Sequence, residues 1–193
     1  AIGLTEAAAL EICIAATRGL VAAHASGVIH RDVKPENILL PSDDSGGCFF
    51  GGQAKLADLG LARLEDSSLE MTQSRATLGT LGFMSPEQVN ESKDVGRPAD
   101  VWGMGATLYA LLAGCPPFTG DQPSQILLNT LKNPHPPLEN VRQDVTAPTL
   151  ALIENCLSKD PGQRYRDAIA LLEAMQGCAG QSPPPSELQG CQE

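Results

Sequence analysis

The sequence predicts a mainly α-helical fold with one small β-hairpin. Several segments carry apolar residues at helical spacing, whereas only two short stretches, residues 37–40 and 55–57, favour extended structure. The chain has 193 residues, of which 42% are hydrophobic, so it can bury a core and is too apolar to be disordered. We expect one domain over residues 1–177, followed by a proline-rich tail over residues 178–193.

The first expected helix runs from Thr5 to about Gly27. Thr5 can accept a backbone N–H at the start of the helix, and His24 suits its last turn. Apolar residues cover more than one face of this segment, which is typical of a helix buried in a core. The two strands of the hairpin follow, joined by a turn-rich loop over residues 41–53 that contains four glycines.

Four further helices are expected after residues 61–82, which show no clear period and predict a long loop. They cover residues 101–113, 122–132, 148–158 and 166–176. The first of them belongs to an uncharged stretch, but Pro116 and Pro117 limit it to 13 residues. At about 1.5 Å per residue it is shorter than the ~30 Å hydrocarbon core of a bilayer, so we expect a buried helix and no membrane span.

The composition argues against some classes of function. The net charge of −10 disfavours binding to nucleic acid, because proteins that bind it carry basic patches. The six cysteines form no C-x-x-C pair, and only three histidines accompany them, so neither a zinc site nor a disulfide framework is expected. Reduced cysteines and the lack of a signal-peptide pattern favour a cytoplasmic location.

The sequence also contains an ordered set of short motifs. The set is HRDVKPEN at residues 30–37, DLG at 58–60, SPE at 85–87, DVWGMG at 100–105 and DPGQRY at 160–165. In this order and spacing it resembles the eukaryotic-type protein kinase family, and its spelling is most similar to that of bacterial serine/threonine kinases. The resemblance implies a protein-kinase-like fold, of which this chain would be the larger, C-terminal lobe.

The resemblance also implies roles for the residues of the first two motifs. Asp32 would orient the substrate hydroxyl and accept its proton, and Lys34 would neutralise charge on the transferred phosphoryl group of ATP. Asn37 and Asp58 would ligate Mg²⁺, because hard cations favour carbonyl and carboxylate oxygens. Leu59 departs from the family pattern, since it stands where phenylalanine is usual.

Other matching residues would support or regulate this site. Thr80 belongs to a segment similar to the family's substrate-docking loop and could hydrogen-bond the Asp32–Lys34 pair. Arg31 would pair with a phosphorylated residue of the activation segment, residues 61–84. We expect structural roles for Asp100, which would hold catalytic-loop amides, and for a buried pair of Glu87 with Arg164. The phosphorylation candidates are Thr72, Ser74 and Thr77.

Two hypotheses follow from what the segment before Asp32 lacks. Residues 1–31 contain no lysine and no G-x-G-x-x-G, so the smaller, nucleotide-covering lobe of a kinase is absent and is expected upstream in a longer parent. The first hypothesis is a fragment of a serine/threonine kinase that uses ATP and Mg²⁺, acts on protein substrates and is inactive alone. The second is a truncated kinase-like binding module without catalysis. Under the first, the face near Ile38, Leu39 and Leu40 should lack its covering.

Overall fold

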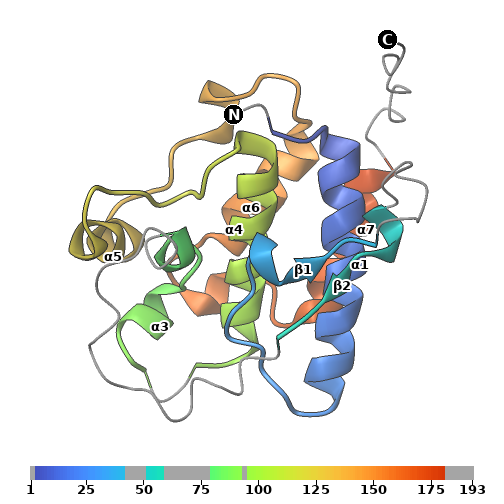
Figure 1. Ribbon diagram of the computed structural model, residues 1–193, viewed down its shortest axis with the longest axis horizontal. Helices are drawn as coiled ribbons and strands as arrows, with labels where there is room; N and C mark the ends of the chain where they lie inside the picture. The colour runs from blue at the N-terminus through green and yellow to red at the C-terminus, as the bar shows by residue number, and fades with distance from the viewer. Residues whose placement is uncertain (1–2, 42–50, 59–78, 93–94, 181–193) are drawn as a thin grey trace.

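The computed structural model describes residues 3–41, 51–58, 79–92 and 95–180, which form a helical body with a two-stranded sheet (Figure 1). The mainly helical fold class is confirmed. Helix α4 lies at the centre, with α1 and α7 on one side and α3 and α5 on the other (Figure 1). The helices are α1 (Glu6–Ala25), α3 (Pro86–Val89), α4 (Arg97–Ala113), α5 (Pro123–Lys132), α6 (Ala147–Cys156) and α7 (Ala168–Ala179), and the strands are β1 (Ile38–Leu39) and β2 (Lys55–Leu56).

Helix α1 begins and ends where the sequence predicts. Thr5 Oγ1 accepts the Ala8 N–H at 3.3 Å, and Gly27 follows the helix with a φ of 75°, a left-handed conformation that favours glycine. By length and composition α1 is the one helix of the described ranges that could cross a membrane, but half of its apolar window is buried inside the protein. It packs against α4 and α7, so we describe it as a core helix.

Helix α4 is the buried centre of the domain. It begins at Arg97, four residues before the expected start, because Pro98 and Asp100 belong to its first turn. Trp102 is fully buried. A Cβ on Gly103 would lie 2.9 Å from the Val33 carbonyl oxygen, so this glycine lets the segment after α1 rest directly on α4.

The hairpin is shorter than predicted and covers part of α1. Strands β1 and β2 are antiparallel, with Ile38 opposite Leu56. Leu39 and Leu40 are 58% and 46% exposed, as expected for an uncovered face, but Ile38 is buried at 7%, because it points into the core from the first position of β1. Our expectation that Ile38 shares the exposed face is therefore wrong.

Two further boundaries differ from the sequence-based expectations. Helix α7 continues through Ala179, two residues beyond Gly177, and Cys178 is buried. Residues 79–81 are helical rather than part of a loop, with a hydrogen bond from the Gly82 N–H to the Gly79 carbonyl. Residues 61–78 of the predicted long loop lie outside the described residues.

Candidate active site

Asp100 anchors the segment between α1 and β1, which we call the catalytic loop (residues 30–37). Its carboxylate is 1% exposed and accepts three hydrogen bonds. Oδ2 accepts the His30 N–H at 2.9 Å and the His24 Nε2–H at 2.8 Å, while Oδ1 accepts the Arg31 N–H at 2.7 Å. Bonds to a buried carboxylate are strong because the acceptor is charged. Asp100 thus fixes the start of the loop on α4.

His30 ties the catalytic loop to the end of β2. Its Nε2 lies 3.0 Å from the Ala57 carbonyl and its Nδ1 accepts the Asp32 N–H at 3.3 Å, so the neutral ring carries its proton on Nε2. The Ala57 N–H donates to the Asn37 carbonyl at 2.8 Å. Since Ala57 directly precedes Asp58, these two bonds place Asp58 beside the loop.

Asp32 lies in a cluster of polar side chains. Its Oδ2 is 3.0 Å from Lys34 Nζ and 3.0 Å from Asn37 Nδ2, which also donates to the Asp32 carbonyl at 2.7 Å. Lys34 Nζ donates in turn to Thr80 Oγ1 at 3.4 Å. The structure therefore brings together Asp32, Lys34, Asn37 and Thr80, four of the residues predicted from the motifs.

The Asn37 and Asp58 side chains are compatible with Mg²⁺. Because Nδ2 of Asn37 faces Asp32, its Oδ1 is directed away from Asp32, and Asp58 is an exposed carboxylate with a φ of 54°. No group of three His, Cys, Asp or Glu residues that could hold a metal occurs within the described residues. Two oxygen ligands are nevertheless sufficient for a magnesium ion whose remaining ligands are phosphate oxygens and water.

Arg31 is the next residue of the expected site. Its backbone has a φ of 65°, and its Nε is buried without a hydrogen-bond partner in the described part of the chain. The phosphorylation candidates that were expected to pair with it lie outside the described residues, as do Leu59 and Gly60. The phosphorylation candidates are Thr72, Ser74 and Thr77.

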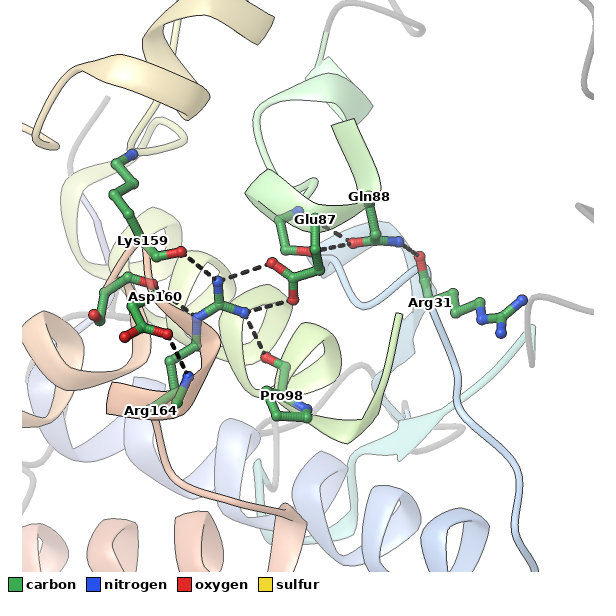
Figure 2. A network of polar contacts seen from close by, with 10 residues as sticks. Arg31, Glu87, Gln88, Pro98, Lys159, Asp160 and Arg164 are labelled. Carbon is green, nitrogen blue, oxygen red and sulfur yellow. Dashed lines mark hydrogen bonds and ion pairs between the residues drawn. The ribbon is translucent and has the colours of Figure 1, made fainter. Parts of the chain in front are cut away.

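Glu87 and Arg164 form the expected ion pair below the loop. The guanidinium binds both carboxylate oxygens of Glu87, at 2.7 and 2.9 Å, and its Nη1 also donates to the Pro98 carbonyl at 2.9 Å (Figure 2). The Arg164 side chain is 0% exposed and that of Glu87 is 11% exposed. The guanidinium also lies 4.9 Å from the Trp102 ring centroid. This pair joins α3 to α4 and to the segment before α7.

Two polar residues that hold the catalytic loop, Gln88 directly and His24 through Asp100, were not predicted from the sequence. His24 donates to Asp100 and, through Nδ1, accepts the Ala168 N–H at 3.4 Å, which connects the start of α7 to the loop. Gln88 Nε2 donates to the Arg31 carbonyl at 2.7 Å (Figure 2). A signal for Gln88 was available, because S-x-x-Q at Ser85 and Gln88 is a capping-box pattern.

A cavity of about 560 Å³ lies between α1 and the hairpin. Its lining combines the exposed Leu39 and Leu40 with the basic side chains of Arg18 and Lys55. It is separate from the cluster around Asp32, whose residues do not contribute to the lining.

Comparisons with known proteins identify the family of this chain. Residues 1–176 match the protein kinase domain family. The serine/threonine-protein kinase PknL of Mycobacterium tuberculosis (strain H37Rv) is 40% identical over 153 residues, which cover 79% of this chain and 36% of that protein. PknB of Mycolicibacterium smegmatis, also a serine/threonine-protein kinase, is 35% identical over 164 residues, 84% of this chain and 25% of the relative. The chain thus spans only about a quarter to a third of these relatives. With a match over nearly its whole length, the chain belongs to the protein kinase domain family.

Proposed function

We propose that this chain is the C-terminal lobe of a kinase that transfers the γ-phosphoryl group of ATP to serine or threonine hydroxyls of proteins. The observation that carries the proposal is the cluster of Asp32, Lys34 and Asn37 held within 3.0 Å contacts on a braced loop. The names of the relatives, serine/threonine-protein kinases, support the choice of acceptor.

In this proposal Asp32 and Lys34 act on the reacting atoms. The Asp32 carboxylate orients the substrate hydroxyl and accepts its proton as the new oxygen–phosphorus bond forms and the bond to the β-phosphate oxygen breaks. The Lys34 ammonium, held between Asp32 and Thr80, offsets negative charge on the transferred group. Thr80, whose Oγ1 lies 3.4 Å from Lys34 Nζ, would contact the hydroxyl-bearing peptide as it approaches this pair.

Asn37 and Asp58 would hold Mg²⁺ through Oδ1 and the carboxylate. The ion would supply positive charge to the phosphate oxygens when it is bound. The two bonds that Asn37 Nδ2 donates to Asp32 keep its amide from rotating, so its oxygen is presented without reorganisation. The proton acceptor and the proposed metal ligand are therefore oriented by the same hydrogen bonds.

We further propose that an upstream lobe of the longer protein completes the nucleotide site. Residues 1–31 contain no lysine, and the side chains of Leu39 and Leu40 are uncovered. The same observations support a second candidate, a kinase-like module that binds partners without catalysis. A cytoplasmic location remains part of the proposal, on the grounds of cysteine content alone.

Phosphoryl transfer by the longer protein tests this proposal. With radiolabelled ATP, Mg²⁺ and a mixed protein substrate, we expect phosphoserine or phosphothreonine, and little transfer by residues 1–193 alone. Asp32→Asn should lower the rate by roughly 10²- to 10⁴-fold, whereas the exposed Asp121→Asn should not. Transfer that survives Asp32→Asn would contradict the assigned role. No transfer by the longer wild-type protein would favour the binding module.

A further inference from the structure

Arg31 is held in an unfavourable backbone conformation immediately before Asp32. Its φ of 65° lies in the left-handed region, which residues with a Cβ rarely adopt. Such a conformation persists only where the surroundings hold it. On one side the Arg31 N–H donates to Asp100 at 2.7 Å, and on the other the Arg31 carbonyl accepts from Gln88 at 2.7 Å. Hydrogen bonds from the Arg31 backbone to Asp100 of α4 and to Gln88 of α3 thus hold this conformation.

The side-chain amide of Gln88 has a defined orientation. Its Oε1 accepts both the N–H and the Oγ–H of Ser85, each at 3.1 Å, so the amide nitrogen must face the other way, toward Arg31. Glu87, the preceding residue of α3, is tied to Arg164 (Figure 2). Adjacent side chains of one short helix therefore bind the buried scaffold and the catalytic loop.

We infer that Gln88 is a positioning residue for Asp32, acting through the carbonyl of Arg31. The peptide group between Arg31 and Asp32 is planar, so the direction of the Arg31 carbonyl also sets the direction of the Asp32 N–H. That N–H donates to His30 Nδ1 at 3.3 Å. Without the Gln88 donor, this peptide loses the bond to its carbonyl and keeps the bond from its N–H to His30, so the Asp32 carboxylate loses part of its fixed orientation.

The role rests on the proposed kinase function, but the contact has a readout of its own. In the 193-residue chain labelled with ¹³C and ¹⁵N, the signals of the Arg31 carbonyl and the Asp32 amide report the hydrogen bond directly. Gln88→Glu keeps an oxygen for Ser85 but cannot donate to Arg31. Gln88→Met removes the donor without adding charge. Gln125→Glu is the matched control, because Gln125 also stands third in its helix and accepts a backbone N–H, that of Asp121.

We expect both Gln88 variants to shift the Arg31 and Asp32 signals while the remainder of the spectrum stays dispersed, and Gln125→Glu to leave them unchanged. In the longer protein, kcat should fall roughly five- to tenfold in both Gln88 variants, with KM for ATP within about twofold of wild type.

Unchanged Arg31 and Asp32 signals would overturn the contact. Shifted signals with an unchanged kcat would overturn the positioning role. If the longer wild-type protein transfers no phosphate, the proposed function fails. The inference then stands if the Asp32 side-chain carboxyl signal moves in Gln88→Met, and falls if it does not.

Discussion

Two ion pairs of this molecule are built in opposite ways. In the pair of Glu87 with Arg164, the arginine side chain is 0% exposed and each guanidinium nitrogen donates to a protein oxygen. In the pair of Asp32 with Lys34, the side chains are 22% and 15% exposed, and within the described residues the Lys34 ammonium contacts Asp32 and Thr80. The Glu87–Arg164 pair uses its hydrogen bonds to join α3, α4 and the segment before α7. The Asp32–Lys34 pair keeps part of its charge accessible to a substrate.

This contrast predicts that the Glu87–Arg164 pair contributes mainly to stability and the Asp32–Lys34 pair mainly to chemistry. Removing one partner of a buried pair leaves an uncompensated charge and costs about 3–5 kcal/mol. A solvent-exposed pair contributes about 0–1 kcal/mol, because water and salt screen it. The pair of Asp32 with Lys34 is partly exposed, so we expect its contribution to lie closer to this range.

Arg164→Met should produce the largest loss of stability. It leaves Glu87 without its cation and removes the Arg164 donor from the Pro98 and Ser158 carbonyls, so we expect the free energy of unfolding to fall by about 3–5 kcal/mol. Urea denaturation of the 193-residue chain, followed by circular dichroism, measures it. Arg166→Met is the matched control, because the Arg166 side chain is 84% exposed. Equal losses in the two variants would contradict the scaffold role of the buried pair.

Asp100→Asn should cause a smaller loss. An amide has one acceptor oxygen where the carboxylate uses two, so a bond to His30, Arg31 or His24 is lost and the NH₂ group faces a donor. We expect the free energy of unfolding to fall by about 1.5–3 kcal/mol. Denaturant titration beside the exposed Asp121→Asn measures the difference. A loss no greater than that of the control would show that Asp100 does not brace the loop.

Lys159, which lies near Arg164 of the buried pair, should make the stability of the protein depend on pH. It lies 3.9 Å from the Phe118 ring centroid, and burial, with a smaller contribution from the nearby Arg164 cation, lowers the pKa of Lys159 from 10.5 to about 8. Between these values the unfolded chain binds a proton that the folded chain releases, so this group makes stability rise with pH.

The test compares wild type with Lys159→Met at about pH 7 and about pH 10. We expect the wild type to gain stability relative to the variant at the higher pH. Taking the difference cancels the opposite contribution of the buried thiols, such as Cys13, whose pKa burial raises to about 12. The exposed Lys132→Met serves as the control. A difference that does not change with pH would contradict the lowered pKa.

Lys34→Met should have the smallest effect on stability. Its ion pair is partly exposed, so we expect the free energy of unfolding to change by no more than about 1 kcal/mol in urea titration. The same change should lower phosphoryl transfer by the longer protein, since it removes a cation from the site. A loss of stability as large as that of Arg164→Met would show that the Asp32–Lys34 pair is as important for stability as the Glu87–Arg164 pair, and would contradict the distinction between them.

The fold class and most of the site were predictable from the sequence because the relevant signals are local. The cap at Thr5, the glycine at position 27 and the apolar period of the later helices each reside in a few consecutive residues. The motif order likewise placed Asp32, Lys34 and Asn37 in one loop. The start of α4 was predicted four residues too late, because the prediction relied on the apolar run from residue 101. The first turn of the helix carries Arg97, Pro98 and Asp100 and has no such run.

The structural features that were not predicted depend on contacts between residues far apart in the sequence. The local S-x-x-Q pattern could have indicated a capping box at Gln88, but the bond of Gln88 to Arg31 crosses 57 positions of the chain. The bond of His24 to Asp100 crosses 76 positions. No local pattern reports such bonds, because each depends on how α1, α3 and α4 pack. The left-handed backbone of Arg31 is hidden for the same reason, since its cost is offset by those distant partners.

The sequence of the coding DNA upstream of Ala1 tests whether this chain is one lobe of a larger kinase. We expect an in-frame extension that encodes a glycine-rich strand-turn-strand, a strand lysine and a helix glutamate, the parts that residues 1–31 lack. An initiation codon directly before Ala1, with a 193-residue product isolated from cells, would contradict it. The braced loop around Asp32 would then belong to a binding module, or to a lobe that another chain completes.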